Sequence, residues 1–275
     1  MPPRTVQLGV VGKPNAGKST FFSAATLQDV KRAPYPFTTI EPNIGVAHVR
    51  IKCVCKELGV SDNPINSYCV DGWRFIPVEL IDVAGLVPEA WKGRGLGNRF
   101  LDHLRRAEAL IHVVDASGST DEEGRPITEG SRDPILDVEF LEREINMWLF
   151  EKLSKDWQRF AMSIEASGEK IEQALYERLS GLQIGIAAIR KALEETGLYA
   201  KKPSNWTKDD ILTFIKYARQ WAKPIIIAAN KADLQASYEN IKLLQEKLKE
   251  RYTVIPTSAE AELALRRAAQ RGFIK

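Results

Sequence analysis

A short glycine-rich stretch, GKPNAGKS at residues 12–19, has the composition and spacing of a loop that binds phosphate. Its glycines let the backbone curl so that amide groups face phosphate oxygens, and Lys18 can reach the outer phosphates of a nucleoside triphosphate. In this arrangement the Ser19 hydroxyl is a ligand for Mg²⁺. A strand-like segment precedes the stretch and a helical one follows it, which is the context that a phosphate-binding loop requires. The nucleotide-binding residues predicted here are Asn15, Ala16, Gly17, Lys18, Ser19 and Thr20.

Two further stretches could complete the phosphate and metal site. In DVAG, Asp82 can hold Mg²⁺ through its water shell, and the amide of Gly85 can sense a terminal phosphate. In the intervening PYPFTTIEPN, either Thr38 or Thr39 can supply another Mg²⁺ ligand. The predicted metal ligands are therefore Ser19, Asp82 and one of these two threonines.

The stretch NKAD could select the base. The carboxylate of Asp233 can accept hydrogen bonds from the N1–H and 2-amino groups of guanine, whereas adenine offers neither donor there. Sites built to pair specific polar groups discriminate by roughly 10⁴ to 10⁵. We expect Asn230 to brace the loop and contact guanine N7, and the stem of Lys231 to cover the base. In the later stretch TSAE, Ser258 and Ala259 belong to the predicted site, and the backbone N–H of Ala259 can donate to guanine O6.

The elements that position these motifs follow from hydrophobic patterning. Near-continuous apolar runs rich in Val and Ile are typical of strands buried on both faces of a sheet. Helical patterns lie between most of them, which indicates an α/β fold around a mostly parallel central sheet. The predicted strands are TVQLGVVG (5–12), IGVAHVRI (44–51), FIPVELIDV (75–83), ALIHVVDAS (109–117), KPIIIAAN (223–230) and YTVIPTSA (252–259).

A long, mostly helical insertion separates the fourth and fifth predicted strands. After a polar loop, apolar residues recur at helical spacing in two series, which divide at Ser167-Gly168. This pattern predicts two long amphipathic helices that form a hairpin and bury their apolar faces against each other; a groove for a partner is the alternative. A third helix should follow, with Thr207 as its N-cap and Asp210 three residues later.

Composition excludes few functions. The 275 residues are 44% hydrophobic with a net charge of +3, which neither demands nor excludes a nucleic-acid partner. Apolar runs stay below the roughly 18 residues of a membrane span and no signal peptide is apparent, so we expect a cytoplasmic protein. His48, Cys53, Cys55 and Cys69 could supply four zinc ligands, but their spacing is not a common zinc pattern. We expect reduced thiols on strands and loops.

Taken together and in this order, the motifs resemble the Obg family of translation-factor-class GTPases, and more narrowly the archaeal form of the YchF subgroup. Matching stretches such as GKPNAGKSTFFSAAT, YPFTTIEPNIGV, VELIDVAGLV and PTSAEAELALRRAA span nearly the whole chain. The resemblance implies a P-loop NTPase G domain over residues 1–117 and 223–275, interrupted by a helical domain over 118–222. It also implies GTP, GDP and Mg²⁺ as ligands, Thr39 rather than Thr38 as the switch ligand, and a link to the ribosome or RNA. We expect a monomer.

Three features depart from the family's pattern. Bacterial and eukaryotic members of the subgroup usually carry a degraded guanine motif and prefer ATP, but NKAD is intact here; GTP is therefore predicted, with an ATPase as the alternative. Members usually continue into a C-terminal TGS domain, whereas this chain stops at GFIK. We therefore expect either a truncated chain or a member without that domain, and binding of RNA or the ribosome through a TGS domain does not carry over. The family often has a Gly-Ala-His-Glu-Gly run where this chain has EAWKG, so a role for that histidine cannot be carried over.

Leu86 follows DVAG at the position where many GTPases have a glutamine that orients water. Because leucine cannot hydrogen-bond to water, we predict slow, glutamine-independent hydrolysis in which Lys18, Mg²⁺ and loop amides stabilise the transferred charge. Asn15 resembles the asparagine that helps bind K⁺ in cation-dependent relatives; alternatively, it only stabilises the loop. The predicted catalytic residues are Lys18, Asn15, Thr39 and Gly85. A competing hypothesis is a nucleotide-gated module that binds RNA or the ribosome with negligible turnover.

Overall fold

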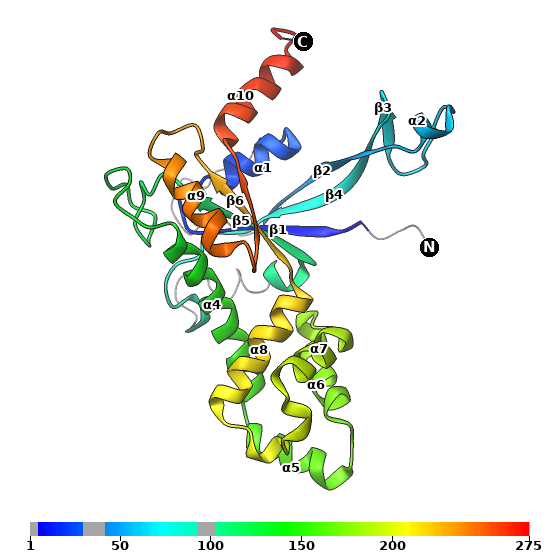
Figure 1. Cartoon of the computed structure of the whole chain (residues 1–275), viewed down its shortest axis with the longest axis vertical. Helices are drawn as coiled ribbons and strands as arrows, with labels where there is room; N and C mark the ends of the chain where they lie inside the picture. The colour runs from blue at the N-terminus through cyan, green and yellow to red at the C-terminus, as the bar shows by residue number, and fades with distance from the viewer. Residues whose placement is uncertain (1–4, 30–41, 93–102, 275) are drawn as a thin grey trace.

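A mostly parallel sheet forms the centre of the computed structural model, which describes residues 5–29, 42–92 and 103–274 (Figure 1). The sheet has seven strands in the order β2-β4-β1-β5-β6-β7, and β3 pairs with β4 off this path. Each of the six predicted strands is confirmed, and β3 is additional. The strands are β1 (Gln7–Val11), β2 (Asn43–Lys52), β3 (Tyr68–Val70), β4 (Trp73–Asp82), β5 (Ala109–Asp115), β6 (Ile225–Asn230) and β7 (Thr253–Pro256).

Consecutive residues of the central strands pack on opposite faces of the sheet. Val10 and Val113 join a cluster with Phe22 of helix α1 (Lys18–Thr26), whereas Val11 and Val114 join the larger cluster on the other face. The strands are thus buried on both sides, which explains their near-continuous apolar sequence. Helices α9 (Ser237–Leu248) and α10 (Ala259–Gln270) complete the outer layers, with α10 packed against α1 and α9 against β7.

Strands β2 and β4 form a long antiparallel ribbon that projects from the sheet (Figure 1). Asn43 pairs with Asp82 at the sheet end, and Lys52 pairs with Trp73 at the far end. There the short helix α2 (Cys55–Leu58) and strand β3 extend the ribbon. The β3–β4 turn consists of Asp71 and Gly72, both with positive φ, as a two-residue hairpin of the primed type requires.

The predicted two-helix hairpin is wrong: four helices occupy its place. The first series is divided at Asp156, which has φ 54°, into α4 (Ile135–Ser154) and α5 (Trp157–Ser167). The second is divided near Gln183, with φ 57°, into α6 (Ile171–Leu179) and α7 (Ile186–Thr196). A left-handed residue ends the helical hydrogen-bond ladder, but helices on both sides of each break face the same core. The apolar periodicity therefore continues across both breaks, so the sequence pattern does not show where one helix ends and the next begins.

The third predicted helix is confirmed as α8 (Lys208–Ala222), with a capping box at its start. The Asp210 N–H donates to Thr207 Oγ1 over 3.2 Å, and the Thr207 N–H donates to Asp210 Oδ2 over 2.6 Å. Helix α8 packs against α4 and α7 and ends just before β6 begins. One continuous buried cluster joins the helical insertion to the sheet. Among the described helices, none combines the length and apolarity that crossing a membrane would need.

Candidate functional site

The predicted site motifs meet at one edge of the sheet. Because β1, β4, β6 and β7 run parallel, their carboxyl ends lie at the same edge. The glycine-rich loop, DVAG, NKAD and TSAE follow these four strand ends in turn. Ligands of open α/β sheets bind at this edge. Thr38 and Thr39, the two candidate switch ligands for Mg²⁺, lie outside the described residues.

The glycine-rich loop has the tight curl that its sequence predicts. Gly12 has φ 146° and Gly17 has φ 97°, both in the region that favours glycine. A Cβ at Gly12 would lie 2.3 Å from the Val113 carbonyl oxygen, and a Cβ at Gly17 would lie 2.2 Å from Asn230 Nδ2. The loop is therefore packed against β5 and the NKAD loop too closely for any side chain at either position. Gly17 directly precedes α1, so the helix N-terminus points its free amides at the loop.

Lys18 is buried at the start of α1 and bends back over the loop. Its Nζ donates to the carbonyl oxygen of Lys13 over 2.7 Å. Burial lowers its pKa from 10.5 to about 8, opposed by the carboxylate of Asp82. Among the described residues the hydrogen-bond partner of Lys18 is this one neutral carbonyl, which compensates a buried ammonium group poorly, whereas a phosphate would compensate it well.

Asp82 and Ser19 lie together at the end of β4. The Ser19 hydroxyl donates to Asp82 Oδ2 over 3.0 Å. The other oxygen, Oδ1, is buried with no hydrogen-bond partner among the described residues. Burial raises the pKa of Asp82, opposed first by Lys18. A hydroxyl beside a carboxylate with an unpartnered oxygen is a donor set that suits a hard divalent cation such as Mg²⁺.

Gly85 and Leu86 follow Asp82 and have different surroundings: the Gly85 backbone lies against the glycine-rich loop, and the Leu86 side chain lies in the apolar core. A Cβ at Gly85 would lie 2.9 Å from the ring of Pro14, so the backbone here passes directly against the glycine-rich loop. The Leu86 N–H donates to the Gly12 carbonyl over 3.1 Å, and its side chain is only 1% exposed within the large apolar core. Leu86 thus fastens the segment to the loop through its backbone, while its side chain points into the protein.

Asn15 sits at the tip of the loop with φ 58°. Its Nδ2 donates to the Gly124 carbonyl oxygen over 2.8 Å, which ties the loop to the segment after β5. This contact is of the kind expected if Asn15 stabilises the loop, and it uses the amide nitrogen rather than the oxygen. Beneath it the buried Lys13 ammonium lies 2.7 Å from an Asp137 carboxylate oxygen and donates to the Thr120 carbonyl.

Asn230 joins the glycine-rich loop to the NKAD and TSAE loops. Its Nδ2 donates to the Ala16 carbonyl oxygen over 3.0 Å, and its Oδ1 accepts the Ala259 N–H over 3.0 Å. The predicted bracing role therefore has a definite geometry. The Ala259 N–H, predicted as a donor to guanine O6, already has this partner inside the protein, so a contact with the base would require Asn230 to share or release it.

Asp233 is exposed at the end of the NKAD loop and is oriented by Ser258, whose hydroxyl donates to Asp233 Oδ1 over 2.5 Å. The carboxylate is therefore positioned with Oδ2 left for another donor. Lys231 has φ 65°, and its ammonium group donates to Asp115 Oδ2 over 2.9 Å and to Ser119 over 3.0 Å. These contacts anchor the ammonium end of the Lys231 side chain to Asp115 and Ser119. The role predicted for its stem, covering the base, stays a prediction.

The sequence analysis missed Asp115 as part of the site. This fully buried carboxylate at the end of β5 accepts hydrogen bonds from Ser117, Thr120 and Lys231. Although burial itself acts to raise it, these hydrogen bonds leave the pKa of Asp115 below its ordinary value. The signal was present in the sequence, since an aspartate ends a strand and the polar run SGST follows.

Comparisons with known proteins find GTPases and GTP-binding proteins among the relatives of this chain. Residues 7–144 match the family described as 50S ribosome-binding GTPase, and residues 228–275 match the Obg-like GTPase YGR210-like, G4 motif-containing domain. The Uncharacterized GTP-binding protein MJ1332 of Methanocaldococcus jannaschii is 52% identical over 268 residues, which cover 98% of this chain and 66% of that protein. A crystal structure of a GTP binding protein from Pyrococcus horikoshii superposes with a TM-score of 0.81 at 46% identity, covering 98% of this chain and 69% of that one.

A more distant relative carries a different name. The Ribosome-binding ATPase YchF of Mycoplasma genitalium is 36% identical over 228 residues, which cover 81% of this chain and 55% of that protein. The chain thus spans between about half and two thirds of the length of these curated relatives.

Proposed function

Because the chain belongs to the Obg-like GTPases, we propose that it binds GTP and hydrolyses it slowly to GDP and phosphate, as a nucleotide switch linked to the ribosome or RNA. The observation that carries this proposal is the bridge made by Asn230 between the glycine-rich loop and the TSAE loop. It supports a single site for phosphate and base, with Asp233 held where it can accept from guanine. A cytoplasmic location and a monomeric state remain predictions.

The proposed phosphate site uses groups that are poorly compensated in the protein alone. Lys18 would neutralise the β- and γ-phosphates, and Ser19 and Asp82 would hold Mg²⁺, with Thr39 as the predicted switch ligand. When bound, Mg²⁺ neutralises charge that develops on the phosphate oxygens. The N–H of Gly85 is proposed to sense the γ-phosphate, because its backbone lies against the loop.

Hydrolysis is proposed to proceed without a glutamine. The buried side chain of Leu86 supports this, because it neither reaches the phosphates nor offers a hydrogen bond to water. The attacking water must be positioned by other groups, and transfer then depends on charge stabilisation by Lys18 and the loop amides. A low intrinsic rate is the expected consequence.

A monovalent cation is the proposed supplement. Asn15 donates to Gly124 through its nitrogen, so its amide oxygen is the atom that would face K⁺. Single-turnover GTP hydrolysis in KCl and in NaCl tests this, with Asn15→Ala as the comparison. Equal rates in the two salts would remove the cation and leave Asn15 as a loop-stabilising residue.

Nucleotide titration tests the identity of the substrate. The full chain should bind GDP and a GTP analogue much more tightly than ATP, by a factor of roughly 10⁴ if Asp233 pairs with guanine as proposed. The variant Asp233→Asn should lose guanine nucleotides and gain xanthosine nucleotides, because its amide can donate to the xanthine 2-oxo group while its oxygen still accepts from Ser258. Tighter binding of ATP than GTP would overturn the proposal.

Two alternatives rest on specific observations. The name Ribosome-binding ATPase YchF favours an ATPase, which the titration separates from a GTPase. The family description as 50S ribosome-binding favours an output on the ribosome. GTP turnover measured with and without ribosomes, together with GTP-dependent RNA binding, separates a hydrolytic switch from a binding module. Turnover that ribosomes stimulate supports the switch. RNA binding with negligible turnover supports the binding module.

A further inference from the structure

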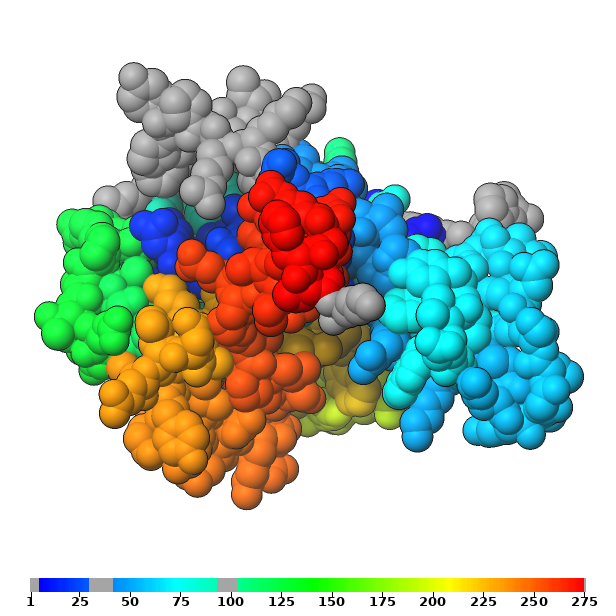
Figure 2. Space-filling model, turned by 90° about the horizontal axis from the view of Figure 1, so that it is seen from above, coloured from blue at the N-terminus to red at the C-terminus, as the bar shows by residue number. Residues whose placement is uncertain are grey.

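The far end of the β2–β4 ribbon is a small lobe with little apolar core. Residues 53–72 protrude there at one side of the molecule, at the opposite end of the ribbon from Asn43 and Asp82 (Figures 1 and 2). Cys53 and Cys55 are buried, at 5% and 7% exposure, yet belong to neither apolar cluster of the molecule. The lobe's exposed apolar side chains are Val54, Leu58, Val60, Ile65, Tyr68 and Val70. A segment that buries so little apolar surface usually depends on a disulfide or a metal ion.

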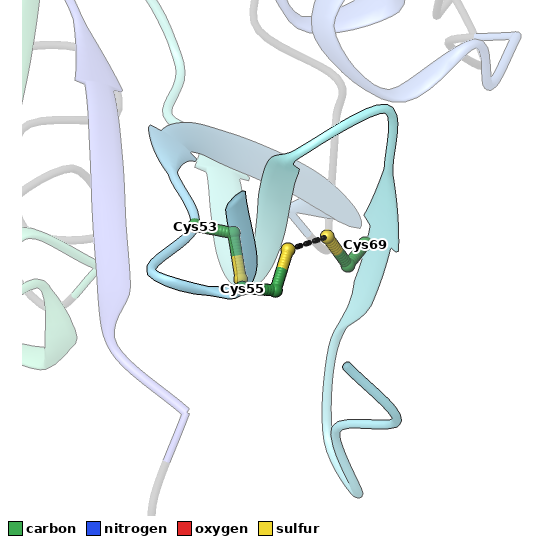
Figure 3. Close-up of side chains that lie close together, drawn as sticks. All are labelled: Cys53, Cys55 and Cys69. Carbon is green, nitrogen blue, oxygen red and sulfur yellow. Dashed lines mark hydrogen bonds between the residues drawn. The ribbon is translucent and has the colours of Figure 1, made fainter. Parts of the chain in front are cut away.

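The three cysteines of the chain converge in this lobe (Figure 3). Cys53 and Cys55 flank the start of α2, and Cys69 lies on β3, which the Asp-Gly turn folds back against β4. Their sulfurs lie within 4.8 Å of one another. The spacing H-x4-C-x-C-x13-C gave no indication of this convergence, because pairing of β3 with β4 produces it. His48 packs edge-on against Tyr68 and is not part of the cluster.

The separation of the sulfurs fits tetrahedral zinc. Cys55 Sγ and Cys69 Sγ are 3.7 Å apart. Two sulfurs that each bond zinc at about 2.3 Å in a tetrahedron lie about 3.8 Å apart. Binding therefore requires little rearrangement of this pair, and a small movement brings Cys53 to the same ion.

A carboxylate and a compensating cation lie beside the sulfurs. Cys53 Sγ donates to Asp62 Oδ2 over 3.0 Å, and the guanidinium of Arg74 pairs with the same carboxylate. Three thiolates, one carboxylate and Zn²⁺ carry a net charge of −2, so a neighbouring arginine is favourable. In a tetrahedral site a carboxylate oxygen lies about 3.5 Å from each sulfur, which is close to the distance from Asp62 to Cys53.

We propose that Cys53, Cys55 and Cys69 bind one zinc ion as thiolates, with a shift of the Asp62 side chain completing four-fold coordination. Each thiol releases its proton to solvent as its sulfur bonds the metal, and nothing is oxidised or reduced. The ion is structural: it joins α2, β3 and the end of β2 in a lobe without its own core. A Cys55–Cys69 disulfide would join only two of the three sulfurs and leave Cys53 buried beside Asp62.

Metal analysis of the full chain tests the site. The reduced protein is stripped with a chelator, given one equivalent of ZnCl₂ and desalted. We expect one zinc per chain for the unaltered protein and for Ser19→Ala, which controls for zinc in the proposed Mg²⁺ site. Cys69→Ser should lose the zinc but still bind GDP, which shows that the G domain is folded. Asp62→Asn should bind zinc roughly 10- to 100-fold more weakly.

A second measurement needs no variant. Co²⁺ added to the stripped protein should give intense sulfur-to-cobalt charge-transfer absorption and the strong visible bands of a tetrahedral site. Failure of the unaltered chain to retain zinc, a cobalt complex without the thiolate band, or a Cys55–Cys69 disulfide that persists with zinc present would each overturn the proposal. Loss of zinc in Ser19→Ala would reassign the ion to the nucleotide site. An unchanged zinc affinity in Asp62→Asn would overturn the role of that carboxylate.

Discussion

Replacing Lys18 by methionine should stabilise the nucleotide-free protein while abolishing GTP binding. Burial lowers the pKa of Lys18 from 10.5 to about 8, so the folded protein holds the ammonium charge less favourably than the unfolded chain. A difference of this size corresponds to about 3 kcal/mol at pH 7. Methionine removes that cost but also removes the hydrogen bond to the Lys13 carbonyl, worth roughly 1 kcal/mol. We expect a net stabilisation of about 2 kcal/mol.

The pH dependence isolates this effect from other titrating groups. Below about pH 8 Lys18 is charged in both states and the full cost applies. Between pH 8 and 10.5 the unfolded chain binds more protons than the folded one, so the stability of the unaltered protein rises with pH. Urea unfolding of both proteins without nucleotide, at pH 7 and about pH 9.5, should show their difference shrinking by about 2 kcal/mol. Lys223, whose pKa burial also lowers to about 8, contributes equally to both proteins and cancels.

The outcome at each pH can contradict the reasoning. If Lys18→Met is less stable than the unaltered protein at pH 7, burial of this ammonium is better compensated than the structure indicates. If the stability difference does not change with pH, Lys18 keeps its ordinary pKa when folded. Saturating GDP provides the matched control: it should stabilise the unaltered protein but leave Lys18→Met unchanged.

Three further substitutions probe the site and the insertion. Asn230→Ala should weaken GDP binding and cost about 2–4 kcal/mol of stability in urea, because the buried Ala16 carbonyl and Ala259 N–H both lose their partner; unchanged GDP affinity would contradict the bridging role. Leu86→Gln should lower stability by about 2 kcal/mol or more without raising single-turnover hydrolysis, because its side chain points into the core; faster hydrolysis at unchanged stability would show that this position faces the phosphates. Thr207→Ala should lower the unfolding free energy by roughly 1 kcal/mol without altering GDP affinity, through loss of the capping box of α8; a change in GDP affinity would show that the insertion is coupled to the nucleotide site.

The sheet and the site motifs could be predicted because local sequence determines them. A strand buried on both faces needs a continuous apolar run, so all six predicted strands are present, and the family comparisons confirm the P-loop GTPase fold. The spacing of Gly12, Gly17 and Lys18 is fixed by the backbone geometry of the loop that it forms. The capping box at Thr207 depends on residues only three positions apart.

Other features depend on contacts that local sequence does not encode. The break at Asp156 leaves the apolar period intact, because α4 and α5 pack against one core. The anchoring of Lys231 by Asp115 joins residues 116 positions apart. Convergence of Cys53 and Cys69 requires a hairpin whose Asp-Gly turn was visible in the sequence but whose third strand was too short to stand out.

The polar side chains of the candidate site fall into two groups. Some have hydrogen-bond or ion-pair partners within the protein, and others are buried without enough partners to offset their charge. Asn230, Lys231 and the Asp115 carboxylate are satisfied by protein partners, so the loops of the proposed base site are already positioned. Lys18 and Asp82 are buried with incomplete compensation, and their pKa values shift toward the neutral forms. Bound phosphate would favour the charged form of Lys18, and a cation would favour that of Asp82. If the chain binds nucleotide as proposed, affinity and stability are opposed at Lys18 and Asp82, whereas at Asn230 one substitution should weaken both.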